Sequence, residues 1–189
     1  MSAEAITILL ALKKYGRVGR YTLSSVTGIG EGVVRRVLNE LRGQGAIRVL
    51  RGGAELTSKG EEILETMLNN AGIAFIIEDD EFARVFNCGC RRCYVLATNK
   101  AFGEGDIVRL RDVAIRNGAD AVLFLRYECP QGKFLILKLG NYFEDMYVDL
   151  GKKLHDLVTK VKCGDSVLIV CGSSNYQLIK SIISVLSGS

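Results

Sequence analysis

The sequence lacks the features that would place the chain in a membrane or in the secretory pathway. No part of it approaches the ~20 consecutive apolar residues of a membrane span. Residues 1–6 do not form a basic segment leading into a long apolar one, so we expect no signal peptide. We therefore expect a cytoplasmic protein with no membrane partner. Apolar residues make up 48% of the chain, enough for packed cores rather than disorder.

Signatures of catalysis are also missing. The single histidine, His155, has no serine elbow or paired carboxylate motif near it, which argues against nucleophilic catalysis. The segment 172–175 lacks the glycine spacing and the lysine of a P-loop, so we do not expect nucleotide hydrolysis. The sequence thus predicts a protein that is not an enzyme and that uses no cofactor.

Positive charge is concentrated in one segment, although the net charge of the chain is only +4. Residues 14–59 carry nine basic and three acidic side chains, whereas residues 71–189 carry 15 basic and 14 acidic ones. Such a concentration suits a polyanionic partner, and double-stranded DNA is the one we expect.

The first third of the chain predicts a winged helix-turn-helix. Apolar periodicity indicates helices over residues 3–15, 23–27 and 31–42, with Thr22 as a cap and a glycine turn at 28–30. Two β-prone arms around Arg51 predict a hairpin, and Ser58 opens a capping-box pattern for a helix ending near residue 68. We assign residues 1–68 to a DNA-binding domain and residues 73–189 to a second domain.

The helix over 31–42 has two chemically different faces. One is apolar, and the opposite one presents glycine, arginine and asparagine. Arginine and asparagine can bond guanine and adenine in the major groove, and a glycine near the helix start permits close approach to a phosphate. The predicted DNA-contacting residues of the domain are Thr22, Gly32, Arg35, Arg36, Asn39, Arg42, Arg51 and Lys59. The alternative is a solvated amphipathic helix with incidental arginines.

Two stretches of this domain carry a family resemblance. Residues 16–47 resemble winged-helix regulators of bacteria and archaea, and residues 56–60 resemble the junction between their last strand and last helix. The whole chain is similar to an archaeal family that joins a winged helix to an uncharacterised C-terminal domain, mainly through residues 111–120. The resemblance implies DNA binding by the first domain and no established activity for the second. The short, uncharged wing tip at Gly52 and Gly53 departs from the pattern.

The second half alternates strands and helices, so we expect an α+β chain whose second domain is an α/β sandwich. From residue 92 the predicted order is βαββαβ plus a C-terminal helix, which allows a ferredoxin-like arrangement. One helix is expected over about residues 146–161. The acidic residues 78–81 are expected to form a solvated turn, with cation binding as the alternative.

Two clusters of the second half could bind ligands. Cys88, Cys90 and Cys93 have a spacing that could supply three metal ligands, but no fourth ligand lies nearby in sequence. We expect no metal there, and either free thiols or a disulfide in or near the turn. A second candidate is an anion site at the start of the last helix, where backbone amides meet hydroxyls. Its residues are Gly172, Ser173, Ser174 and Asn175, and simple helix capping by Ser174 or Asn175 is the alternative.

These observations together predict a transcriptional regulator. The second domain would sense a small-molecule effector, dimerise, or both. Its apolar last helix is the expected interface of a homodimer, and the alternative is that this helix is plain core. The alternatives are an enzyme of unknown reaction in the second domain and a protein–protein adaptor.

Overall fold

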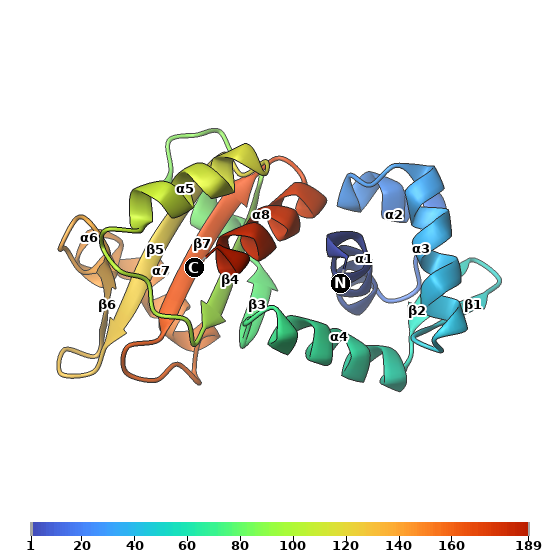
Figure 1. Cartoon of the computed structure of the whole chain (residues 1–189), viewed down its shortest axis with the longest axis horizontal. Coiled ribbons are helices and arrows are strands. Elements are labelled where there is room, and N and C mark those ends of the chain that lie inside the picture. Colours follow the sequence, from blue (N-terminus) through green and yellow to red (C-terminus); the bar gives the residue numbers. More distant parts are fainter. Residues whose placement is uncertain (1, 189) are drawn as a thin grey trace.

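The N-terminal region consists of three helices, a hairpin and a fourth helix. The computed structural model describes residues 2–188. The elements in chain order are α1 (Ala3–Tyr15), α2 (Arg20–Thr27), α3 (Glu31–Gly43), β1 (Ile47–Leu50), β2 (Gly53–Leu56) and α4 (Ser58–Asn70) (Figure 1). This is the predicted order. The hairpin turns at Arg51 and Gly52, because Leu50 pairs with Gly53.

The C-terminal region is built on one five-stranded sheet. Its elements are β3 (Phe75–Glu78), the 3-10 helix η1 (Asp80–Val85), β4 (Arg92–Thr98), α5 (Ile107–Arg116), β5 (Ala121–Glu128), β6 (Lys133–Ile136), α6 (Phe143–Met146), α7 (Val148–Leu157), β7 (Ser166–Gly172) and α8 (Asn175–Ser187). The strand order is β3-β4-β7-β5-β6, and every neighbouring pair is antiparallel. The chain is therefore α+β, as predicted. The single helix predicted over 146–161 is replaced by α6 and α7.

Helices cover both faces of the sheet. Leu96 and Leu168 belong to a core that includes α5 and α8, whereas their neighbours Val95 and Ile169 belong to a second core with η1, α6 and α7. The alternation follows from the two-residue period of side chains along a strand. The domain is not a ferredoxin-like sandwich, which carries its helices on one face of the sheet. Here α7 and α5 lie on opposite faces, and β3 adds a strand at the edge.

The first of these cores continues into the N-terminal region. It joins the apolar side of α1, with Ile6 and Leu9 fully buried, to that of α8, with Leu178 and Ile182 fully buried. Of the two predictions for the last helix, plain core is therefore correct, and a dimer interface on its apolar side is wrong. No helix within residues 2–188 combines the length and the apolar character needed to cross a membrane.

Two predicted helix caps lie elsewhere. Gly19 occupies the N-cap of α2, and Thr22 lies exposed inside that helix. Thr57, rather than Ser58, caps α4: its Oγ1 accepts a hydrogen bond from the Gly60 amide at 3.0 Å. Threonine at an N-cap satisfies an amide that the helix itself leaves without a partner.

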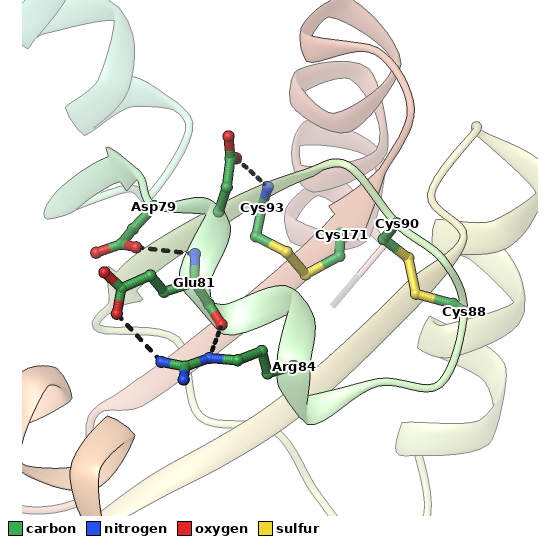
Figure 2. The surroundings of a disulfide bond; sticks show 8 residues. Asp79, Glu81, Arg84, Cys88, Cys90, Cys93 and Cys171 are labelled. Carbon is green, nitrogen blue, oxygen red and sulfur yellow. Dashed lines mark hydrogen bonds and ion pairs between the residues drawn. A yellow bond between two sulfur atoms is a disulfide. The ribbon is translucent and has the colours of Figure 1, made fainter.

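All six cysteines are paired. The disulfides are Cys88–Cys90, Cys93–Cys171 and Cys129–Cys163. Figure 2 shows that the first lies in the loop before β4, while the second joins β4 to β7, where Cys93 and Cys171 are direct partners in the sheet register. The cysteine cluster seen in the sequence is thus divided between a loop and a buried strand pair.

Candidate nucleic-acid interface

Helix α3 carries most of the predicted DNA-contacting residues on its exposed side. It lies with the β1–β2 hairpin at the end of the molecule remote from the sheet (Figure 1). Val34, Val37 and Leu41 are buried on its inner side. The exposed residues of this helix include five of the eight predicted contacts: Gly32, Arg35, Arg36, Asn39 and Arg42. A helix with this outer surface has the donors and acceptors that base edges can pair with.

The other three predicted residues surround this helix at different places. Arg51 is exposed at the tip of the hairpin, and Thr22 is exposed on α2. Lys59, in the first turn of α4, passes beside Gly45, since a Cβ built on that glycine would lie 3.6 Å from the lysine Cδ. Lys59 therefore lies near the C-terminal end of α3.

The arginines of α3 are available to a polyanion. Arg36 Nη1 pairs with Glu40 Oε1 at 2.9 Å, but both side chains are more than half exposed. Such i,i+4 pairs contribute only about 0.3–0.5 kcal/mol, so a phosphate or a base can compete for this guanidinium. Arg35 and Arg42 form no side-chain hydrogen bond or ion pair within the described part of the chain. The helix therefore offers three guanidinium groups at little energetic cost.

Two features near α2 and the hairpin could not be expected from the sequence. Glu55 of β2 accepts from Arg17 Nε at 2.9 Å and also bonds Arg48, and these arginines hold the pKa of Glu55 below its ordinary value. Tyr21 is 64% exposed, and the Arg20 guanidinium lies 4.7 Å from the centre of its ring. Sequence periodicity could not identify this tyrosine as exposed, because aromatic residues more often belong to a core.

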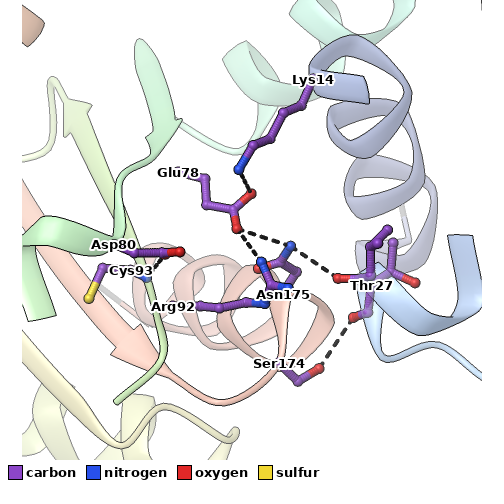
Figure 3. A network of polar contacts seen from close by, with 9 residues as sticks. Lys14, Thr27, Glu78, Asp80, Arg92, Cys93, Ser174 and Asn175 are labelled. Atoms are coloured by element: carbon purple, nitrogen blue, oxygen red, sulfur yellow. Dashed lines mark hydrogen bonds and ion pairs between the residues drawn. The ribbon is translucent and has the colours of Figure 1, made fainter. Parts of the chain in front are cut away.

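A buried carboxylate links the two regions of the protein. Glu78, whose side chain is 6% exposed, accepts from Lys14 Nζ of α1 at 2.8 Å and from Arg92 Nη1 of β4 at 2.6 Å (Figure 3). Although desolvation opposes it, the bond to Glu78 raises the pKa of Lys14. The prediction of a solvated acidic turn over 78–81 is wrong at this residue, because β3 brings the carboxylate under α1.

The predicted anion site also contacts the N-terminal region. Ser174 Oγ donates to the carbonyl of Thr27 at 3.3 Å, and Asn175 Nδ2 donates to the carbonyl of Val26 at 3.2 Å (Figure 3). Ser174 occupies the N-cap position of α8 but makes no side-chain capping bond. Of the other two predicted residues, Gly172 is buried at the end of β7 and Ser173 is exposed. These contacts hold the C-terminal end of α2.

The turn between α2 and α3 approaches α8 closely. Gly28 has φ +76° and ψ 14°, a left-handed conformation that favours glycine. A Cβ at this position would lie 2.3 Å from Ser174 Oγ. The turn that positions α3 is therefore in contact with the C-terminal domain.

The geometry defines a class of protein: a helical domain with an exposed basic helix, fixed to an α+β domain through a shared core. Residues 3–70 match the family model described as the CggR N-terminal DNA binding domain. The chain belongs to the family described as Domain of unknown function (DUF4443), whose model matches residues 88–187. No curated protein matches the chain.

One solved structure extends the likeness to the whole chain. The hypothetical protein PH0730 from Pyrococcus horikoshii OT3 is 24% identical, with a TM-score of 0.72 over 98% of this chain and 91% of that chain. At this identity the likeness concerns the fold. Because it covers nearly all of both chains, it includes the N-terminal and C-terminal regions together.

Proposed function

We propose that the protein is a transcriptional regulator that reads duplex DNA with helix α3. The observation that carries the proposal is the exposed side of α3, where Arg36 and Asn39 follow Gly32 at helical spacing. The match of residues 3–70 to a DNA-binding family supports it independently. In this reading α3 enters the major groove as the second helix of a helix-turn-helix, and the β1–β2 hairpin is the wing.

The remaining basic residues have a positioning role in this proposal. Arg51 at the hairpin tip and Lys59 at the start of α4 flank α3, where they can contact phosphates on either side of the groove. Only two residues, Arg51 and Gly52, form the tip. We therefore propose that the hairpin contacts the phosphate backbone of the DNA rather than inserting deeply into the minor groove.

DNA binding at fixed salt tests the proposal. Genomic fragments enriched by the purified protein are titrated with wild type, Arg36→Ala and Lys59→Ala, with Arg116→Ala on the exposed end of α5 as the matched control. We expect Arg36→Ala to cost about 1–3 kcal/mol on the preferred sequence. Lys59→Ala should weaken binding to all sequences alike and reduce the salt dependence. Equal, salt-insensitive binding by wild type and Arg36→Ala would refute the assignment.

We also propose that the regulator acts as a homodimer and that its C-terminal domain senses a small molecule without catalysing a reaction. A single reading helix contacts few base pairs, and a two-fold dimer reading two half-sites is the usual solution. Since α8 is core, the pairing surface has to lie elsewhere. Light scattering at micromolar concentration, with and without DNA, tests the dimer, and a monomer under both conditions would contradict it.

A further inference from the structure

A polar cavity lies where the helix-turn-helix meets the C-terminal domain. Its volume is about 280 Å³. Its walls include Ser25 and Gly28 on the N-terminal side and Asp80, Arg91, Ser173 and Ser174 on the other. Drug-sized ligands usually occupy larger pockets, of about 300–1,000 Å³, so this cavity suits a small metabolite. Any occupant would touch both α2 and the loops of the sheet domain.

The two arginines on the cavity wall differ in whether they have a partner. Arg92 also lines the cavity, but its guanidinium is committed to the buried Glu78 at 2.6 Å. The neighbouring Arg91 is exposed, and its side chain forms no hydrogen bond or ion pair with any other residue in the range 2–188. Its backbone is fixed, because its amide donates to the carbonyl of Gly172 at 3.2 Å. Arg91 thus supplies one uncompensated positive charge at a defined position.

Asp80 supplies the opposite charge. Its Oδ1 accepts from the backbone amide of Cys93 at 3.0 Å, which orients the carboxylate, and it forms no ion pair within the described residues (Figure 3). The cavity therefore holds one unpaired guanidinium and one unpaired carboxylate. A phosphate dianion would be attracted by Arg91 but repelled by Asp80. A ligand carrying one group of each sign satisfies both.

The hydroxyls of the cavity can serve the same ligand. Ser25 and Ser173 make no side-chain hydrogen bond to other residues between 2 and 188, so each can donate to a ligand oxygen. The start of α8 lies beside them, and its first backbone amides have no capping side chain. Guanidinium, hydroxyls and helix start together favour a carboxylate as one group of the ligand.

We propose that this cavity binds a free α-amino acid, with its carboxylate on Arg91 and Ser173 and its ammonium group on Asp80. The ligand's effect on the affinity for DNA rests on the proposed function. Because the ligand touches the turn at Gly28 that positions α3, the binding of the ligand and the binding of DNA are coupled. Coupling is reciprocal, so the amino acid changes the dissociation constant for DNA by the same factor by which DNA changes that for the amino acid.

The binding test uses the full-length protein without DNA. Each of the common L-amino acids at millimolar concentration is screened by thermal shift, and hits are measured by titration calorimetry. For a hit, its amide, which lacks the carboxylate, and its 2-hydroxy acid, which lacks the ammonium group, are measured on the wild-type protein, with inorganic phosphate as a third probe. We expect saturable binding of at least one amino acid and a loss of roughly tenfold or more for each analogue, the size of effect that one charged hydrogen bond can give.

Variants check the assignment to these residues. Arg91→Gln and Asp80→Asn should each weaken binding of the amino acid about tenfold or more, while Arg116→Gln leaves it unchanged. Asp80→Asn keeps an oxygen to accept from the Cys93 amide, and circular dichroism verifies that each variant is folded. Failure of all amino acids to bind, tighter binding of phosphate, or binding by both variants as tight as by the wild type would overturn the proposal. Because this arm needs no DNA, it fails independently of the DNA-binding test.

Discussion

Replacing Gly28 by alanine tests whether the helix-turn-helix is held against the C-terminal domain. The left-handed backbone of Gly28 costs a non-glycine residue about 1–2 kcal/mol. The new Cβ would also lie 2.3 Å from Ser174 Oγ and 3.2 Å from Ser174 Cβ. Rotating the serine away breaks its bond to the Thr27 carbonyl, which costs about 1 kcal/mol more. We therefore expect Gly28→Ala to lower the free energy of unfolding by about 2–3 kcal/mol.

A matched control separates the two contributions. Gly45 has φ +74°, but the nearest atom to its built Cβ is 3.6 Å away. Gly45→Ala should therefore lose only the backbone contribution, about 1–2 kcal/mol. The measurement is urea unfolding followed by circular dichroism, with Ser174→Gly added to both variants as a double-mutant cycle. Ser174→Gly should cost about 1 kcal/mol in the wild type and in the Gly45→Ala protein, but nothing further in the Gly28→Ala protein, where its bond to Thr27 is already broken. Equal losses in the two alanine variants, with no coupling to Ser174, would refute the contact between the turn and α8.

Two further predictions concern the sheet domain. The Cys93–Cys171 disulfide spans 78 residues, so replacing both cysteines by alanine should lower the free energy of unfolding by about 4–5 kcal/mol in the chain-entropy model. The same replacement at Cys88 and Cys90, two residues apart, should cost far less; comparable losses in denaturant unfolding would contradict the pairing. Burial raises the pKa of Tyr94 far above its ordinary value, so the folded state retains the phenolic proton. The protonated phenol therefore contributes fully to stability below pH about 10, and this contribution is lost as the pH rises further. Tyr94→Phe should flatten this alkaline decline in the free energy of unfolding. An unchanged decline would contradict the burial of the phenol.

The elements of the N-terminal domain could be predicted because their determinants are local. The apolar residues of α3 recur at helical spacing, and the structure buries Val34, Val37 and Leu41 as that spacing requires. The outward position of Arg36 and Asn39 follows from the same period. Exact helix starts were less predictable. Thr22 and Ser58 both have capping chemistry, but the backbone begins each helix elsewhere, and Thr57 is an equally good cap one residue before Ser58.

The contacts between the two regions could not be predicted from the sequence. Lys14 and Glu78 are separated by 64 residues, and Ser174 and Thr27 by 147. Nothing local distinguishes Glu78 from the acidic residues that follow it. It is buried because β3 pairs with β4 and brings it beneath α1, and such a position depends on tertiary topology rather than on local periodicity. The same topology removes the side chain of Ser174 from capping α8.

The position of these contacts bears on the proposed reading of DNA by α3. In a helix-turn-helix, the first helix and the turn set the angle at which the second helix enters the groove. Here the end of α2 is held by Ser174 and Asn175, and the turn at Gly28 leaves no room for a side chain. Both residues follow closely after β7, whose last residue, Gly172, pairs in the sheet with Arg92 at the start of β4. A displacement of this strand pair would therefore act on the α2–α3 turn through Ser174 and Asn175. We infer that a ligand or a partner that moves the end of β4 or β7 changes the orientation of α3, and with it the affinity for DNA.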